Sequence, residues 1–287
     1  MRGVVDQRLF ALNSFLGDRR PFGVPLNLDS IRCVERFDAA FQLERMIRCR
    51  QEWPHAGVEI RAFGGATAIR VAADFPQKNV VICFDGSCLS ELPNIISFYR
   101  EVNRGFVFTL PYGTLDDDIF DALTRGGMGC GESGHVLAIV PAMSEPSLVV
   151  RPSPSEEKEL YLDLYRRAFS TQRMVTDEQV SFQWLNDSLE SAQRFICEVD
   201  GEPVGMASLN IREGGAYCSS AGVLPEFRGR GVHRALIAAR VNAAYAAGCE
   251  VAFGGGALFG MPMMNFARSG CTILPLGTTW WLPGGRA

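Results

Sequence analysis

The sequence predicts an α/β (α+β) fold made of two mixed-sheet units in tandem. The chain has 287 residues, a length that favours two domains. Short apolar runs typical of buried strands alternate with longer segments in which apolar residues have helical spacing. The last part of each half repeats the order strand, helix, strand, helix, strand. We expect an N-terminal arm at residues 1–30, a first unit at 31–144 and a second unit at 145–287.

The first unit is expected to start with a long helix and to continue with strands. Asp29 or Ser30 can cap a helix that runs to about residue 50, and its apolar residues form a broad stripe. A hairpin is expected around Gly64 and Gly65, because apolar and polar residues alternate on both sides of them. The strands expected in this unit are 57–64, 66–73, 79–85, 105–111 and 134–141, and its further helices are 90–103 and 116–126.

The second unit is expected to follow a polar linker at 142–147. Its first helix starts at Ser155, and the two glutamates of its first turn suit the positive end of the helix dipole. The turn DGEP at 200–203 favours a hairpin, and Gly248 ends a long Ala-rich helix. The expected strands are 148–152, 194–201, 202–211, 216–224 and 249–253, with a final strand or pair in 271–283, and the expected helices are 155–169, one from about 177, 232–247 and 261–270.

Composition and charge narrow the possible function classes. The net charge is -4 and the pI is about 5.5, which argues against a broad nucleic-acid surface, because phosphate neutralisation needs clustered Lys and Arg. Nine cysteines without C-x-x-C spacing, such as Cys83 in VVICF, are expected to be small buried residues of a reducing compartment. Three histidines without paired spacing make a metal site unexpected.

No stretch has the character of a signal peptide or the length of a membrane span. We therefore expect a cytoplasmic protein without a membrane partner, either a monomer or a homodimer.

The loop PEFRGRG at 225–231 carries the clearest functional signal. It lies between a predicted strand and a predicted helix, where the first helical N–H groups lack partners and the dipole is positive. Glycines let a phosphate approach the backbone, and Arg228, Arg230 and Arg234 add positive charge. The run matches neither the P-loop nor the G-x-G-x-x-G pattern. Taken alone, the two glycines favour the simpler interpretation of a tight turn with solvated arginines.

The longer run VLPEFRGRGVH at 223–233 resembles the acetyl-CoA signature of the GCN5-related N-acetyltransferase (GNAT) superfamily, whose core is R-x-x-G-x-G/A. The order of predicted elements around it is similar to that family as well, over about residues 148–282. The resemblance implies an acyl-CoA N-acyltransferase fold. It also implies an acetyl-CoA-dependent N-acetyltransferase that acts on a small-molecule amine by direct attack in a ternary complex.

The resemblance also implies a cofactor site. Backbone N–H groups from about Gly229 to His233 would hold the CoA pyrophosphate, and the edge of AGVL would bind the pantetheine arm like an added strand. His233 stands where the family usually has Gly or Ala, and it either donates to a phosphate or faces solvent. Asn265 resembles an Asn of related tandem members that contacts CoA. The implied cofactor residues are Val223, Leu224, Arg228, Gly229, Arg230, Gly231, Val232, His233 and Asn265.

The first unit resembles the same fold in degenerate form. Its loop DGSCLSEL at 85–92 lacks the Arg-x-x-Gly-x-Gly pattern, and Asp85 and Glu91 would repel a pyrophosphate. The chain thus looks like a tandem member of the family with one working and one vestigial half. The vestigial half would cover the substrate cleft or brace the sheet.

The catalytic groups are less clear from sequence. Candidates for the general base are Glu213 and a water held by Ser219 or Ser220. Phe266 occupies the position of the family's tyrosine acid, and a phenyl ring cannot donate a proton. Cys218 is a possible nucleophile or, more simply, a core residue, and only one of Cys218 and its neighbour in the pleat can face the cleft.

Two further features leave alternatives open. The triple glycine at 254–256 either makes room for the acyl arm or acceptor, or is a flexible loop. The two tryptophans at 280–281 are expected in core and domain-interface packing. The missing tyrosine and glutamate also allow a transferase for a longer or acidic acyl-CoA, or a non-catalytic acyl-CoA-binding protein.

Overall fold

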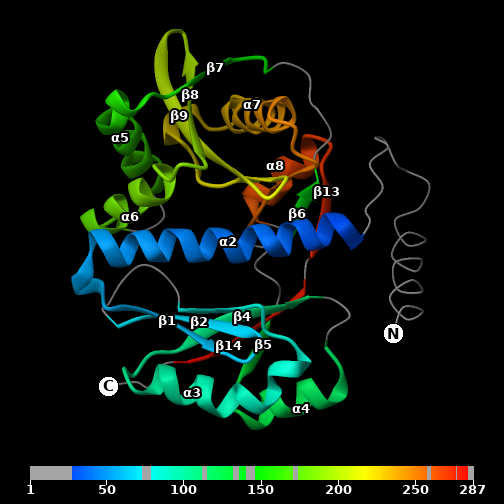
Figure 1. The fold of residues 1–287 in the computed structure, drawn as a ribbon. Coiled ribbons are helices and arrows are strands. Elements are labelled where there is room, and N and C mark those ends of the chain that lie inside the picture. The colour runs from blue at the N-terminus through cyan, green and yellow to red at the C-terminus, as the bar shows by residue number, and fades with distance from the viewer. Residues whose placement is uncertain are drawn as a thin grey trace.

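A computed structural model describes residues 28–72, 79–111, 115–131, 136–139, 146–170, 174–256, 260–275 and 277–283. They form two units, each built on a mixed β-sheet, with helix α2 (Leu28–Glu52) lying across the molecule between them (Figure 1). The arm expected at 1–30 lies outside the described residues, except for residues 28–30, which belong to α2. None of the helices described has the length and apolar composition needed to span a bilayer.

The first unit has a six-stranded sheet in the order β1-β2-β3-β4-β14-β5. The expected hairpin is confirmed, since β1 and β2 pair antiparallel with Phe63 opposite Ala66. The strands of this sheet are β1 (Val58–Phe63), β2 (Ala66–Val71), β3 (Val80–Ile82), β4 (Phe106–Pro111), β5 (Gly129–Gly131) and β14 (Gly277–Leu282).

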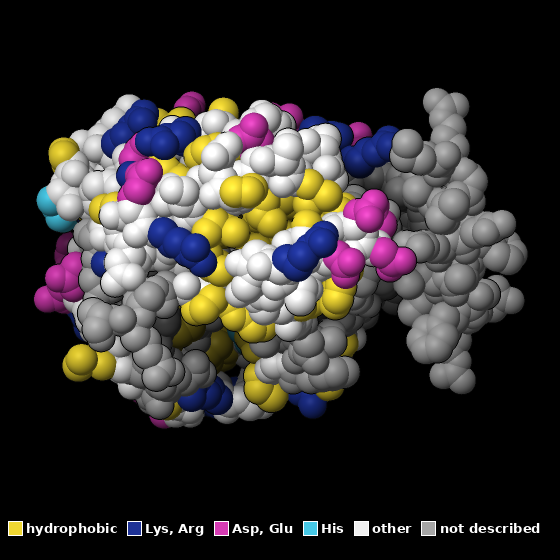
Figure 2. Space-filling model, turned by 90° about the horizontal axis from the view of Figure 1, so that it is seen from below, with side chains coloured by type: hydrophobic (Ala, Val, Ile, Leu, Met, Phe, Trp, Pro, Cys, Tyr) yellow, Lys and Arg dark blue, Asp and Glu magenta, His cyan; other side chains and the backbone are white. Residues whose placement is uncertain are grey.

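Two helices, α3 (Leu92–Arg100) and α4 (Asp117–Arg125), pack on the face of this sheet that lies away from α2 (Figure 1). Asp116 caps α4 by accepting a hydrogen bond from the Ile119 N–H, at 2.9 Å. The helix expected from residue 90 instead begins with a short 3-10 turn, η2 (Gly86–Glu91), capped by Asp85. Seen from this side, hydrophobic side chains gather in the middle of the face, remote from the site described below (Figure 2).

The second unit has the strand order β12-β10-β9-β8-β7, and β11 also pairs with β9. Its strands are β7 (Val149–Pro152), β8 (Ala192–Val199), β9 (Glu202–Arg212), β10 (Gly215–Cys218), β11 (Ala221–Val223) and β12 (Val251–Gly254). Its helices are α5 (Lys158–Phe169), α6 (Asp177–Asp187), α7 (Val232–Ala246) and α8 (Met261–Arg268), with short 3-10 turns at Ser155–Glu157 and Pro225–Phe227.

The two units exchange strands. The expected terminal segment 271–283 splits into β13 (Thr272–Pro275) and β14, and β14 lies in the first sheet, between β4 and β5. In return, β6 (Val136–Ile139) leaves the first unit, pairs antiparallel with β13 and runs beside β12 (Figure 1). The sheets therefore cross the boundary that we drew between residues 144 and 145.

The two tryptophans at the end of the chain show how tightly β14 fits. Trp280 is 1% exposed in the core of the first unit, not in that of the second. Trp281 lies flat over the neighbouring strand, where a Cβ at Gly129 or Gly131 would come within 2.7 or 2.6 Å of its ring. Glycines are therefore required in β5, a strand that the sequence did not reveal.

Helix α2 connects the two cores. Its first half packs against the second unit, where the Phe37 ring meets Phe253 edge-on at 5.1 Å. Its second half packs against the hairpin of the first unit through Met46 and Cys49. Seven of the nine cysteines are buried as expected, but the expectation is wrong for Cys83 and Cys130, which are exposed; Cys83 lies in a bend with a positive φ of 58°. Because α2 bridges both units, side chains from the first half of the chain reach the second unit's cleft.

Candidate acetyl-transfer site

The glycine loop forms an open cradle at the N-terminus of α7. Gly231 is the N-cap residue with a φ of 85°, and Gly229 has a φ of 77°. A Cβ built at either glycine would meet nothing within 4 Å. The first turn of the helix closes with the bond from the Ala235 N–H to the Gly231 carbonyl, so the N–H groups before it point out of the helix end. This is the geometry in which a helix binds an anion.

The arginines of the loop do not all face that cradle. Arg228 donates from Nη2 to the Ala168 carbonyl at 2.8 Å, which ties the loop to the end of α5. The Arg230 guanidinium lies 5.1 Å from the centre of the Phe227 ring. Leu224 and Val232 are buried, so only their backbone could contact a cofactor. The cradle is thus made by backbone groups, while Arg228 braces it.

The two polar residues expected near CoA, His233 and Asn265, contact each other. Asn265 Nδ2 lies 3.2 Å from His233 Nδ1, which joins the first turn of α7 to α8. Burial, together with the charge of Arg240, lowers the pKa of His233 from 6.5 to about 4. The imidazole is therefore neutral at pH 7. His233 is half-buried against Asn265 and offers no positive charge.

The shifted pKa of His233 predicts a pH-dependent stability. Between pH 6.5 and 4 the unfolded chain takes up a proton that the folded protein does not, so the free energy of unfolding falls as the pH falls. The full loss is about 3 kcal/mol, and most of it should disappear in His233→Gln. Urea unfolding at several pH values measures this. His55→Gln, at an exposed histidine, is the matched control and should keep the wild-type slope.

The strands of the second unit splay beside the cradle. β10 pairs parallel with β12 over Gly215–Cys218, whereas β11 pairs with β9 on one side only, among the described residues. Ser219 and Ser220 form the break between β10 and β11. β11 then runs from this break to the glycine loop, three residues or roughly 10 Å. Its unpaired edge matches the expected position of an extended cofactor arm.

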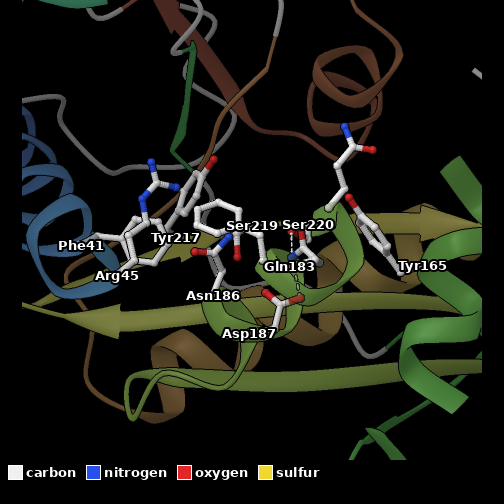
Figure 3. Close-up of a pocket in the computed structure, with 11 residues that line it drawn as sticks. Phe41, Arg45, Tyr165, Gln183, Asn186, Asp187, Tyr217, Ser219 and Ser220 are labelled. Atoms are coloured by element: carbon white, nitrogen blue, oxygen red, sulfur yellow. Dashed lines mark hydrogen bonds between the residues drawn. The ribbon is translucent and has the colours of Figure 1, made fainter. Parts of the chain in front are cut away.

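A cavity of about 250 Å³ lies at the start of this edge (Figure 3). Its wall combines α2 with α5, α6 and the end of β10, so both halves of the chain build it. Figure 3 shows Arg45 on one side of the space and Asp187 on another. The wall carries the polar side chains of Arg45, Gln179, Gln183, Asn186, Asp187, Ser219 and Ser220.

A chain of hydrogen bonds leads from the cavity to a buried carboxylate. Asn210 Nδ2 donates to Ser219 Oγ at 2.8 Å, and Ser219 Oγ lies 2.7 Å from Ser208 Oγ. Ser208 in turn donates to Asp187 Oδ1 at 2.7 Å. The hydrogen of Ser219 is directed to Ser208, and one of its two lone pairs accepts from Asn210. Its second lone pair is free to accept a hydrogen bond from a donor in the cavity.

Asp187 is held rigidly and its basicity is raised. Its Oδ2 accepts from Tyr161 Oη at 2.9 Å and from Gln183 Nε2 at 2.6 Å. Burial raises the pKa of the Asp187 carboxyl, against the lowering effect of these bonds and of Ser208. A carboxylate with a raised pKa is a better proton acceptor, and its place beside the cavity suits general-base work.

Arg240 supports the break between the strands. It is 1% exposed, and its Nη1 donates to the carbonyls of Ser219 at 2.7 Å and Ser208 at 3.2 Å. Its Nε donates to the Leu236 carbonyl within α7. The helix that carries the glycine cradle therefore also positions the serine chain.

The expected catalytic residues are only partly brought together. Ser219 and Ser220 line the cavity, but Glu213 lies in the exposed turn at the other end of β10, with a positive φ of 52°. Of the two neighbours in the pleat, Tyr217 faces the cavity, while Cys218 is 6% exposed in the core. Glu213 therefore lies at the opposite end of β10 from the cavity and from Ser219 and Ser220.

Phe266 explains the first of the three glycines. A Cβ at Gly254 would lie 2.4 Å from the Phe266 ring, so the ring occupies the space beside the end of β12. At Gly256 the nearest atom would be Met263 Sδ at 3.2 Å. Gly254 and Gly256 thus make room for packing of α8 against the end of the strand.

Sequence reasoning missed Asp187, Ser208, Arg240 and Arg45. One signal was available: Arg240 is the one charged residue between Ala235 and Ala247, in a helix that is otherwise apolar or amide-bearing. Such a residue in a buried helix needs acceptors nearby. The other three carry no local signal, because their partners come from distant segments.

Residues 158–270 match the model of the Acetyltransferase (GNAT) family. Among solved structures, the fold is similar to a GCN5-related N-acetyltransferase from Kribbella flavida, with a TM-score of 0.60 and 17% identity over 92% of this chain and 98% of that one. It is also similar to a GCN5-related N-acetyltransferase from Sphaerobacter thermophilus, with a TM-score of 0.54 and 16% identity over 78% and 79% of the two chains.

A functionally unknown conserved protein from Staphylococcus epidermidis ATCC 12228 has a similar fold as well, with a TM-score of 0.56 and 12% identity over 80% of this chain and 96% of that one. At these identities the likeness to solved structures concerns the fold. The chain has no match among curated proteins. The family match nevertheless covers the glycine cradle, the serine chain and Asp187. Over residues 158–270 the chain therefore matches a GNAT acetyltransferase domain.

Proposed function

We propose that the protein transfers an acetyl group from acetyl-CoA to the amine of a small molecule, by direct attack in a ternary complex. The observation that carries this proposal is the hydrogen-bond chain from Ser219 to Asp187, placed at one end of the unpaired β11 edge. The glycine cradle lies at the other end of that edge. A cofactor bound along the edge with its pyrophosphate at Gly229 and Gly231 would present its thioester near the cavity.

The chain supplies a complete route for the amine proton. The amine nitrogen attacks the thioester carbonyl carbon, a new N–C bond forms and the C–S bond breaks. The proton lost by the nitrogen passes to Ser219 Oγ, the Ser219 proton passes to Ser208, and that of Ser208 passes to Asp187. The thiolate of CoA takes its proton from water, because Phe266 has none to give.

We further propose that residues 31–144 are a degenerate GNAT-like unit and that 145–287 is the working one. In the first unit, the loop that corresponds to the cradle is 85–92, and its own carboxylate occupies the backbone donors. Asp85 Oδ1 accepts from the Ser87 N–H at 2.9 Å and from Ser87 Oγ at 2.6 Å. The carboxylate thus satisfies an amide that a phosphate would need. The role that remains for this unit is to hold α2 as one wall of the cavity.

The other functions considered have less support. A longer acyl chain was suggested by the three glycines, and Phe266 fills the space beside the first of them. A non-catalytic role was suggested by the lack of an expected carboxylate, and Asp187 supplies one. Both remain distinguishable by experiment, with acetyl-CoA and longer acyl-CoAs compared side by side.

The test is an acyl-transfer assay with acetyl-CoA and a panel of small amines, in which CoA release is followed by a thiol reagent and the product by mass spectrometry. We expect an acetylated amine and one equivalent of CoA. Thioester hydrolysis at the background rate with every amine, in spite of acetyl-CoA binding, would contradict the proposal.

A further inference from the structure

The cavity holds a cation that the hydrogen-bond chain does not use. Arg45 projects into the wall from α2, and its guanidinium lies 5.4 Å from the Phe41 ring centre and 5.9 Å from that of Phe182 (Figure 3). Its Nη2 donates to Gln42 Oε1. The two rings and this amide hold the guanidinium in place beside the cavity.

Arg45 has no counter-ion among the described residues. The neighbouring arginine on the same helix face, Arg48, pairs with Glu52 at 2.5 Å, but Arg45 forms no ion pair in the described part of the chain. Asp38 is the acid whose charge acts on it, and Asp38 Oδ1 accepts from Gln42 Nε2 at 3.2 Å and not from the guanidinium. Arg45 Nε is fully buried and has no acceptor.

A second polar group in the wall of the same cavity is buried and unsatisfied. Asn186 lines the cavity next to Asp187, and its Oδ1 is buried without a donor. Unpaired buried polar atoms are costly, and a ligand that pairs them recovers the loss. A ligand with an acceptor for the Arg45 guanidinium and a donor for the Asn186 amide would therefore suit the cavity.

The charged side chains of the cavity wall also favour a ligand with an anionic end and a cationic end. Arg45 is the cation on the α2 side, and Asp187 is the anion at the end of α6 (Figure 3). Tyr165, Phe182 and Tyr217 supply apolar surface between the polar groups. At about 250 Å³, the space suits a compact molecule rather than a polymer side chain with its backbone.

We propose that the acceptor is a small amino acid or close derivative, whose carboxylate binds Arg45 while its amine lies at Asn186 and Ser219. A planar carboxylate can take two donors of a guanidinium, and the amine then reaches the serine chain. This inference rests on the proposed function, since it names the acceptor of the same site.

Matched substrate pairs provide the first test, and they need no variant. Each amino acid of a panel is compared with its own carboxamide, which keeps the amine and removes the negative charge. We expect kcat/KM to be about 100-fold higher for the acid, because the amide leaves a buried charge unpaired. Equal values for acid and amide, or a preference for aminoalkyl phosphates over amino carboxylates, would overturn the inference.

Variants then assign the preference to Arg45. Arg45→Gln should raise KM for the acid and bring acid and amide within a few-fold, whereas Arg45→Lys should keep part of the preference. Arg50→Gln, at an exposed arginine of the same helix, should leave it unchanged. Thermal unfolding without ligand shows that each variant is folded. A preference for the acid that survives in folded Arg45→Gln would refute the assignment.

Calorimetry separates failure of this inference from failure of the proposed function. The same amino acids are titrated into the protein saturated with CoA, a complex in which no acetyl group can be transferred. Binding that Arg45→Gln weakens about 100-fold supports the inference even if no acetylation is seen. Acetylation of other amines without any binding of amino acids would reject it and leave the proposed function intact.

Discussion

Gly231→Asp is expected to raise the dissociation constant for acetyl-CoA at least about 100-fold. Gly231 is the N-cap of α7 with a φ of 85°, and the space in front of it is empty. A carboxylate there would occupy the anion site and repel the pyrophosphate, in addition to the loss of dipole and amide contacts. Calorimetric titration of acetyl-CoA gives the result directly.

The matched control is Gly201→Asp in the turn between β8 and β9. Gly201 has a φ of 79° and equally open surroundings, so the backbone strain of about 1 kcal/mol is the same in both variants. Both should lose a similar free energy of unfolding, but only Gly231→Asp should lose affinity. Equal affinity for acetyl-CoA in the two variants would mean that the loop is a turn and not a phosphate cradle.

Asp187→Asn is expected to lower kcat by about 100- to 1000-fold, with little change in the KM for acetyl-CoA. The amide has the shape of the carboxylate but cannot accept the proton that arrives through Ser208. The amide has one oxygen where the carboxylate has two, so it cannot accept from Tyr161 and Gln183 as well as from Ser208. The free energy of unfolding should therefore fall by about 1–3 kcal/mol, together with kcat.

The pH dependence distinguishes a proton acceptor from a structural group. In the wild type, kcat should rise with pH through the raised pKa of Asp187, since only the ionised carboxylate accepts a proton. The acidic limb should be absent from Asp187→Asn. Asp163→Asn, at an exposed carboxylate on α5, is the control and should keep the wild-type profile. If folded Asp187→Asn retained kcat within threefold, the route through Ser208 would be wrong.

The parts of this molecule that the sequence predicted well are those whose determinants are local. The glycine cradle needs a strand, a turn with left-handed positions and a helix start, all within 223–235, and each is recognisable from residue type. The hairpin at Gly64 and Gly65 is equally local. The same holds for α7, whose end is marked by Gly248 with a φ of 77°.

The parts that were missed depend on contacts between distant segments. Arg45 and Phe41 reach the cavity because α2 crosses between the units, and no nearby residue signals this. The exchange of β6 and β14 could not be predicted, because either strand has a composition that suits either sheet. Glu213 was chosen for its charge and its position near a strand, and the length of β10 carries it away from the cavity.

The exchanged strands also constrain how the chain can fold during synthesis. The gap between β4 and β5 is filled by β14, which leaves the ribosome about 150 residues after β5. Until then β4 and β5 lack the strand that lies between them, and the core position that Trp280 later occupies is uncovered. The first half therefore cannot complete its structure ahead of the second, and the cavity, which needs α2 held by the first unit, is among the last features of the molecule to form.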